Sequence, residues 1–478
     1  MTMIGFTTPE KAGISKGSIQ RFLSELQRRG INMHSVLMLK GNDIFYEKYW
    51  APFHKDMPHR MYSVTKSFVA IAVGFLMEEG KLNLDDPIIS YFPDKLPKTL
   101  SPYLEKQTIR HMLMMSTAMV GVNWFKPGVY DRTKFYFSET PNRPAGTLFD
   151  YDSCGSYILG ALVERVSGMG LFDYLNQKLL SRLGGFENAT ILLSPDGVAW
   201  GDSAMVCTPR ALLNFAKFVM NLGTWEGERL LGEDYLKDAT SCQTTNDLEC
   251  RKGYNRFGYG YQIWMNEQNG FSFHGMGGQY AICIPDKDFI FVCTGDNQYN
   301  DYASEILFRA VFDILIPDEE EVECESELST ANGCAHSDFA EKITGKTFYC
   351  DLNPMGIKWL RLNFAGGEGE FVYENDQGEK ILPFGLKKNI FCKFPQLGYS
   401  NERGNVHEIT DFKYDCACSA GWIEEKKLQL RVQIIDRYFG SLVITFGFRN
   451  ENTLAVRMIK YAEDFLNEYD GWIAAKAE

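Results

Sequence analysis

One stretch of the sequence carries a serine and a lysine at a spacing that suits nucleophilic catalysis. Ser63 and Lys66 lie at the head of an apolar run that ends at Gly80. On a helix, residues three apart share a face and their side chains are close enough to interact. A serine hydroxyl is a weak nucleophile until a nearby base takes its proton. Lys66 can be that base only when neutral, and burial and the positive end of a helix both disfavour its ammonium form.

The helix end that carries this pair also presents backbone N–H groups. The N–H of Ser63 is predicted to point outward, where it would stabilise the oxyanion of a tetrahedral intermediate. Ser63–Lys66 is the only Ser-x-x-Lys in the chain. A purely structural interpretation stays open on this motif alone, because a serine also caps helices and a lysine is usually exposed.

Residues 8–315 resemble a family of serine hydrolases. It includes class C β-lactamases, D-alanyl-D-alanine peptidases, family VIII esterases and aminohexanoate-oligomer hydrolases. Ser-x-x-Lys belongs to the signature of β-lactamases and penicillin-binding proteins. The resemblance rests on Met61-Tyr-Ser-Val-Thr-Lys-Ser-Phe68, Leu82-Asn-Leu-Asp-Asp-Pro87 and Pro144-Ala-Gly-Thr-Leu-Phe-Asp-Tyr-Asp-Ser153. The last segment has Tyr-x-Ser where the β-lactamases have Tyr-x-Asn.

The resemblance implies roles for the residues of this second motif. Tyr151 would share protons with Ser63 and Lys66 and protonate the leaving group, since a phenol can move a proton in either direction. Ser153 would hold the substrate or Lys66 by a hydrogen bond. The alternative for Tyr151 is a core tyrosine whose hydroxyl is satisfied by a neighbour.

The third element of the site is expected in His274-Gly-Met-Gly-Gly-Gln279, where family members have Lys-Thr-Gly or His-x-Gly. Glycines let a strand approach the substrate closely, and the second oxyanion N–H is expected from Met276 or Gly277. His274 would orient the acyl group or tune the local field; the alternative is a histidine at a strand end without a role. Met276 departs from the family pattern, which has glycine at this third position.

The order of elements predicts an α+β fold. A helix over residues 8–30 and two strands at 35–40 and 44–50 precede a mostly helical segment at about 81–250, and four closely spaced strands with a last helix follow it. Strands so close together pair antiparallel. We predict a β-lactamase/transpeptidase-like domain over 1–316 and an acidic linker over 317–337. Residues 338–478 alternate in polarity and predict a small all-β domain, a curled sheet or barrel.

Composition excludes several classes of partner. The formal net charge of −13 argues against nucleic acid and anionic membrane surfaces. The sequence has no run long enough for a membrane span and begins without the pattern of a signal peptide, so a cytoplasmic location is expected. The 12 cysteines are then expected to be reduced.

We predict that the chain needs no metal or organic cofactor. Cys416 and Cys418, with Cys392 or His407, offer ligands for a zinc site, but no second Cys pair follows Cys-x-Cys and packing is the favoured interpretation. Gly-x-Ser-x-Gly occurs once, at residues 13–17, inside the helix predicted over 8–30 and not after a strand, which argues against an α/β-hydrolase.

These observations together predict a serine hydrolase that cleaves a small ester or amide through an acyl-enzyme on Ser63. Tyr-x-Ser and Gly-Met-Gly-Gly-Gln resemble the esterase and amide-oligomer hydrolase branch. A β-lactamase or a penicillin-binding D-alanyl-D-alanine carboxypeptidase is the alternative enzyme, and a non-catalytic ligand-binding protein is the third hypothesis. The expected partner is a small ester or amide or a short peptide, and homo-oligomer formation is left open.

Overall fold

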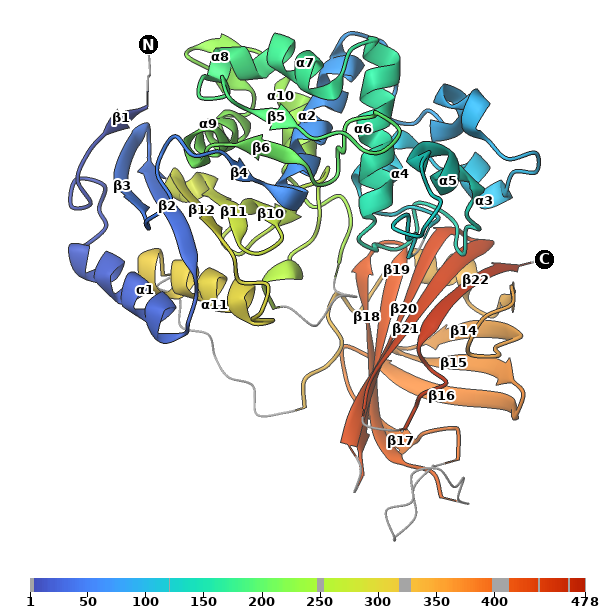
Figure 1. Ribbon diagram of the computed structural model, residues 1–478. Helices are drawn as coiled ribbons and strands as arrows, with labels where there is room; N and C mark the ends of the chain where they lie inside the picture. Colours follow the sequence, from blue (N-terminus) through green and yellow to red (C-terminus); the bar gives the residue numbers. More distant parts are fainter. Residues whose placement is uncertain are drawn as a thin grey trace. The chain divides into compact units, whose positions relative to one another are not determined.

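The computed structural model describes residues 4–119, 121–246, 253–317, 328–397, 412–436, 439–462 and 465–477 (Figure 1). The chain divides into two compact units, and each is described by itself. The first comprises Met1–Leu100, Gln107–Glu139 and Phe149–Glu321, and the second comprises Ser101–Lys106, Thr140–Leu148 and Val322–Glu478. Most of the acidic segment predicted as a linker, residues 318–327, lies outside the described residues.

A twisted sheet forms the centre of the first unit, and its strand order is β1-β3-β2-β12-β11-β10-β9. All neighbours pair antiparallel except β1, which runs parallel to β3 at one edge. The α+β prediction is therefore confirmed. The strands are β1 (Gly5–Phe6), β2 (Met33–Lys40), β3 (Asp43–Tyr49), β9 (Trp264–Met265), β10 (Phe271–Gly275), β11 (Gln279–Ile284) and β12 (Phe289–Gly295).

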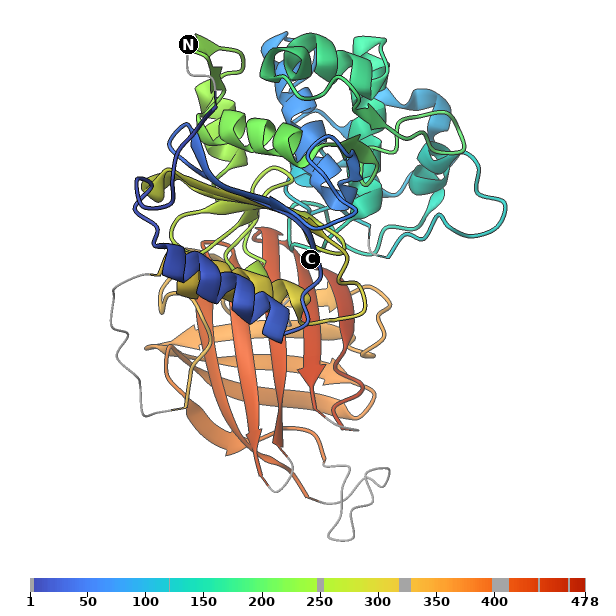
Figure 2. The ribbon, with the colours of Figure 1, turned by 60° about the vertical axis from the view of Figure 1, so that its left-hand side comes forward.

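Two helices, α1 (Lys16–Arg28) and α11 (Ala303–Ala310), cover one face of this sheet (Figures 1 and 2). Ser15 caps α1 by accepting a hydrogen bond from the N–H of Ser18, which is why the helix begins there and not at residue 8 as predicted. Its buried face packs on the sheet, and the Phe22 ring meets Phe291 of β12 edge-on at 5.6 Å.

The other face of the sheet carries the helical segment and α2 (Thr65–Glu78) (Figure 1). Every residue of α2 from Thr65 to Leu76 is buried, as expected of a helix that is apolar all round. Gly80 ends the segment with φ of +68°, a conformation that glycine adopts without strain. The remaining helices of this unit are α4 (Ile109–Leu113), α5 (Arg132–Ser138), α6 (Ser153–Ser167), α7 (Leu171–Leu175), α8 (Ser181–Leu183), α9 (Pro209–Met220) and α10 (Glu233–Ala239).

Short strands and helical turns complete the first unit. Strand β4 (His59–Arg60) pairs with β6 (Met205–Cys207), which also pairs with β5 (Thr190–Ile191), and β7 (Thr224–Trp225) pairs with β8 (Glu228–Arg229). The turn η1 (Tyr62–Val64) directly precedes α2. No helix in the described part of the chain is long and apolar enough to cross a membrane.

The second unit is a β-barrel. Its antiparallel sheet runs β16-β15-β14-β13-β22-β21-β20-β19-β18-β17, and a parallel pairing of β16 with β18 closes it. Large side chains fill the interior, among them Phe371, Phe446 and Trp422. The strands are β13 (Thr347–Cys350), β14 (Trp359–Ala365), β15 (Glu368–Asn375), β16 (Gly378–Leu386), β17 (Ile390–Lys393), β18 (Asp415–Glu424), β19 (Lys427–Ile435), β20 (Phe439–Asn450), β21 (Thr453–Tyr461) and β22 (Gly471–Ala477).

Two segments from earlier in the sequence belong to the barrel unit. Helix α3 (Pro102–Glu105) brings the Tyr103 hydroxyl to within 2.6 Å of a carboxylate oxygen of Asp351. In the segment Thr140–Leu148, the Arg143 guanidinium lies over the Trp472 ring at 4.1 Å. The unit also contains α12 (Phe339–Ile343).

We expect Phe22→Ala to destabilise the first unit by about 3–5 kcal/mol, because it leaves a cavity between α1 and the sheet. Denaturant unfolding followed by tryptophan fluorescence measures the effect. Leu193→Ala is the control: Leu193 is 64% exposed, so its loss should change the free energy of unfolding by less than about 0.5 kcal/mol. Equal effects of the two substitutions would contradict the described packing.

Candidate active site

Ser63 and Lys66 lie side by side at the start of the buried helix. Helix α2 does not begin at Ser63 as predicted, because Ser63 belongs to the 3₁₀ turn η1. The Lys66 Nζ is 2.9 Å from the Ser63 Oγ and donates a second hydrogen bond of 2.7 Å to the backbone carbonyl of Asp202. Lys66 is only 1% exposed. The distance to Ser63 is within the range in which a proton passes directly between two groups.

The backbone before Ser63 is strained and held in place. Tyr62 has φ of +48°, a region that non-glycine residues adopt rarely and at a cost. Its carbonyl accepts a 2.6 Å hydrogen bond from the Thr65 hydroxyl, which itself accepts a 2.9 Å bond from the N–H of Met205. Met61 N–H donates to the Met205 carbonyl at 2.8 Å. Met205, the first residue of β6, therefore holds in place the turn that carries Ser63.

Asp202 is a neighbour of Lys66 that sequence reasoning missed. Its side chain is buried, and burial raises the pKa of the carboxyl to about 6, although the positive charge of Lys66 acts in the opposite direction. The carboxyl of Asp202 is thus a second ionisable group close to the Lys66 amine. No motif or spacing in the sequence distinguishes this aspartate from others.

Tyr151 lies next to Lys66, just before α6. The Lys66 Nζ is 5.1 Å from the centre of the Tyr151 ring, and the ring stacks on Trp264 at 5.4 Å. The following residue, Asp152, caps α6 by accepting a 2.9 Å bond from the N–H of Gly155. Ser153, the other predicted residue of this motif, is the first residue of α6 and is half-buried.

Gln262 ties together the helices that carry these groups, and it too was missed. Its carbonyl accepts a 2.8 Å bond from Ser67 of α2, and its side-chain oxygen accepts a 2.6 Å bond from Ser156 of α6. Its amide nitrogen donates to the carbonyl of Met112 in α4 at 2.8 Å. This buried network fixes the position of α2 relative to α6, and hence of Lys66 relative to Tyr151.

Strand β10 packs against the turn η1, as expected for the third element of the site. The closest approach is at Gly275, where a Cβ atom would lie 2.3 Å from the carbonyl oxygen of Met61. Only glycine fits there without moving one of the two backbones. The contact therefore requires glycine at position 275. It does not require glycine at position 276, where this chain has Met276 and the family pattern has glycine.

The other predicted residues of the third element lie in different surroundings. His274 stacks on Trp264 at 5.1 Å, and its Nε2 is 2.5 Å from the Ser272 Oγ. Met276 and Gly277 follow the end of β10, in the turn before β11, and Met276 is 52% exposed. Since Trp264 contacts the rings of both His274 and Tyr151, it links the second element to the third.

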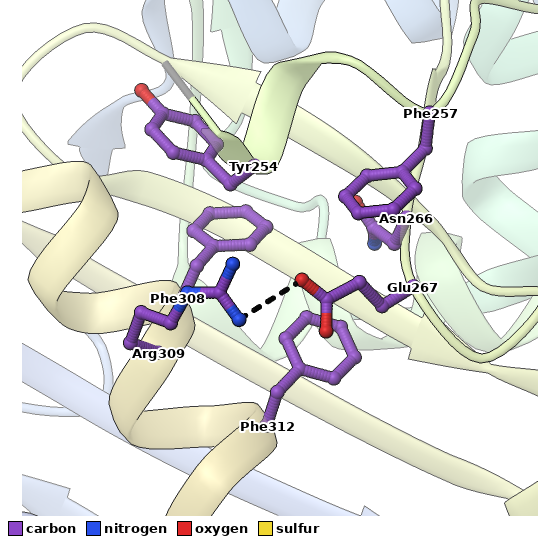
Figure 3. Close-up of a pocket in the computed structure, with 7 residues that line it drawn as sticks. All are labelled: Tyr254, Phe257, Asn266, Glu267, Phe308, Arg309 and Phe312. Atoms are coloured by element: carbon purple, nitrogen blue, oxygen red, sulfur yellow. Dashed lines mark ion pairs between the residues drawn. The ribbon is translucent and has the colours of Figure 1, made fainter. Parts of the chain in front are cut away.

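A recess near β9 and α11 adjoins the surroundings of His274 (Figure 3). Two of its lining residues, Tyr254 and Phe308, also contact the His274 ring, at 5.9 and 5.2 Å between ring centres. Arg309 and Glu267 form an ion pair of 3.2 Å in it. The residues that line it are Tyr254, Phe257, Asn266, Glu267, Phe308, Arg309 and Phe312, so it contains none of the predicted catalytic residues.

The fold and the arrangement at α2 define a β-lactamase/transpeptidase-like protein. The Beta-lactamase family model matches residues 19–311, more than half of the chain, and the chain belongs to this family. The resemblance noted from the sequence is therefore confirmed. The family and the names of relatives, which include a 6-aminohexanoate-dimer hydrolase and an esterase, indicate a hydrolase.

Individual relatives are distant in sequence. The 6-aminohexanoate-dimer hydrolase of Paenarthrobacter ureafaciens is 23% identical over 310 residues, which cover 60% of this chain and 78% of that protein. Esterase EstB of Burkholderia gladioli is 28% identical over 167 residues, which cover 31% of this chain and 42% of that protein. The octameric penicillin-binding protein homologue of Pyrococcus abyssi shares the fold, with a TM-score of 0.50 and 18% identity over 96% of this chain and 99% of that one.

We expect Asp202→Asn to change how stability depends on pH. The folded-state pKa of Asp202, about 6, lies above its ordinary value of 3.8, so its contribution is fully present below pH 3.8 and is lost as pH rises through 6. Asparagine stays neutral. The variant should exceed the wild type in stability above pH 6 by up to about 3 kcal/mol, and the difference should shrink toward pH 4.

Denaturant unfolding across pH 4–8 measures this difference. Asp301→Asn, at an exposed position, serves as the control and should give a difference that does not vary with pH. An Asp202→Asn protein that is less stable than wild type at pH 8 would contradict the expectation.

Gly275→Ala should impair reactivity at Ser63, because the added methyl group forces β10 away from η1. Displacements of about 1 Å cost on the order of a hundredfold in rate. We expect labelling of Ser63 by a fluorophosphonate to slow by at least about tenfold. Gly17→Ala on the exposed side of α1 is the matched control, where alanine meets no close neighbour and should leave the rate unchanged.

Proposed function

We propose that this protein is a serine hydrolase that cleaves a small ester or amide through an acyl-enzyme intermediate on Ser63. The observation that carries the proposal is the 2.9 Å contact between the Ser63 hydroxyl and the amine of the buried Lys66. An exposed lysine beside a capping serine, the structural alternative, would not be enclosed in this way.

The reaction begins with attack of the Ser63 Oγ on the substrate carbonyl carbon, while its proton passes to the Lys66 Nζ. The tetrahedral oxyanion is stabilised by backbone N–H groups, with that of Ser63 as one donor and one from the turn at Met276–Gly277 as the other. Tyr151 returns the proton to the leaving alcohol or amine as the carbon–oxygen or carbon–nitrogen bond breaks. Water then attacks the acyl ester and gives one proton to the same amine–phenol pair, which passes it to the Ser63 oxygen as the acyl–oxygen bond breaks and the acid leaves.

The substrate class is supported by the second motif and by the relatives. A relative named 6-aminohexanoate-dimer hydrolase and one named esterase both match this chain, and the Tyr-x-Ser at Tyr151 resembles the esterase and amide-oligomer hydrolase branch of the family. His274 and Ser153 would then contact the acyl or leaving group. The octameric relative motivates a measurement of the oligomeric state of this chain in solution.

Intact-mass analysis after reaction with a fluorophosphonate tests the nucleophile. Wild type should gain one phosphonyl group, Ser63→Ala none, and Ser181→Ala, at an exposed position, should behave as wild type. Lys66→Met should slow hydrolysis of p-nitrophenyl esters by at least about a thousandfold and Tyr151→Phe by about a hundredfold or more. An unmodified wild-type protein, or equal labelling of Ser63→Ala, would refute the proposal.

A β-lactam in place of the fluorophosphonate separates the two enzyme hypotheses. Turnover of esters or short amides without β-lactam hydrolysis supports the proposed activity. A long-lived β-lactam adduct on Ser63 would instead assign the protein to the penicillin-binding alternative. Tight binding of a small ester with neither turnover nor adduct would identify the non-catalytic binding protein.

A further inference from the structure

Three cysteines of the barrel unit converge at one point. Cys392 lies on β17, and Cys416 and Cys418 lie on the neighbouring strand β18. Their sulfur atoms are 3.5 Å apart between Cys392 and Cys416, 3.6 Å between Cys416 and Cys418 and 3.9 Å between Cys392 and Cys418. The three sulfurs therefore form a nearly equilateral triangle.

Strand geometry explains why they meet. Cys416 and Cys418 are two residues apart, so their side chains leave the strand on the same face. Cys392 is the direct partner of Cys416 in the antiparallel pairing of the two strands, which places the third sulfur opposite the first two. The face that they share is the inner wall of the barrel, since Cys416 and Cys418 are fully buried in its core and Cys392 packs against them half-buried.

The size of the triangle matches a metal ion. A point in its plane at equal distance from the three sulfurs lies about 2.1 Å from each, and a small displacement from the plane lengthens this to the roughly 2.3 Å of a zinc–sulfur bond. The sulfurs are too far apart for a disulfide, whose bond is about 2.05 Å long, and the structure has all three cysteines as free thiols.

The chemistry of the cluster selects the kind of ion. Thiolates are soft ligands that prefer Zn(II) and Cu(I) to hard ions such as Mg(II) or Ca(II). Several thiolates close together in an apolar interior would repel one another, and a bound cation offsets this cost. The half-buried position of Cys392, on a strand that pairs with β18 at one end of the sheet order, provides a route of entry.

We propose that Cys392, Cys416 and Cys418 bind one soft metal ion of the Zn(II) or Cu(I) class through their three sulfurs. On binding, the thiols release their protons to solvent and three metal–sulfur bonds form, without electron transfer. The site lies within the barrel unit and is independent of the proposed hydrolase activity. It replaces the interpretation of these cysteines as simple packing.

Metal titration of the full-length, reduced and chelator-stripped protein tests the proposal. Zn(II), Cd(II) and Cu(I) are added in separate experiments, and bound metal is counted by mass spectrometry of the elements after dialysis. We expect one ion per chain, a sulfur-to-metal charge-transfer band in the ultraviolet with Cd(II), and a rise in melting temperature. Competition with chelators of known affinity then determines whether Zn(II) or Cu(I) binds more tightly.

Substitutions identify the ligands. Cys392→Ser removes the half-buried sulfur and should weaken binding at least about a hundredfold and abolish the rise in melting temperature. Cys416→Ser should do the same, and circular dichroism checks that each variant is folded. Cys334→Ser, at an exposed cysteine of the same unit, is the matched control and should bind like wild type.

Three outcomes would overturn the proposal. They are the absence of stoichiometric binding of any of the three metals, unchanged binding by Cys392→Ser, and loss of two of the three thiols to a disulfide in the metal-free protein. Ser63→Ala should bind metal as wild type does, so a failure of the metal site and a failure of the proposed hydrolase activity are distinguishable.

Discussion

The hydrogen bond between Lys66 and Ser63 lies in the interior of the first unit. Burying an amine costs free energy unless it is hydrogen-bonded, and the surrounding residues supply its hydrogen bonds. Two groups accept hydrogen bonds from this amine: the Ser63 hydroxyl and the backbone carbonyl of Asp202. The Asp202 carboxyl near the amine is neutral or negative depending on pH, because burial raises its pKa to about 6. A lysine enclosed in this way, in hydrogen-bond contact with a serine hydroxyl, suits the proposed exchange of a proton between the two groups.

The position of Ser63 is determined by backbone contacts more than by its own side chain. Tyr62 holds a strained conformation, and the hydrogen bonds of Thr65 and Met61 with Met205 stabilise it. On the opposite side, the close approach of Gly275 to Met61 brings β10 against the same turn. Ser63 thus lies beside two segments, at Met205 and at Gly275, that are both distant from it in the sequence.

The barrel illustrates a different use of buried polar atoms. Its core is apolar, and a closed sheet leaves few unpaired edges. Within it, three sulfurs gather on the inner wall of two adjacent strands. In the first unit the buried polar groups surround Ser63 and Lys66, whereas the three sulfurs suit a ligand that stabilises the barrel wall.

Alternation and spacing along the chain predicted much of the fold. The order of elements, the antiparallel pairing and the hairpin of β2 and β3 followed from local patterns, because period and turn residues act over a few positions. Helix α1 starts later than predicted since Ser15 caps it, and the first of the four strands predicted after the helical segment consists only of the two residues of β9. Before β9, Gly258 has φ of +106°, which interrupts an extended strand. The closure of the barrel by β16 and β18 depends on a pairing that alternation does not specify.

By itself, the sequence determined that a serine and a lysine three residues apart lie at the start of an apolar segment, and that the motifs around them resemble one family of hydrolases. Only the tertiary structure decided that Asp202 lies beside Lys66, that Gly275 is the glycine the third element needs, and that Cys392 joins Cys416 and Cys418. Helical spacing is a local property that a chain carries wherever it folds. Contacts between residues tens to hundreds of positions apart arise from how whole strands and helices pack, which no spacing in the sequence records.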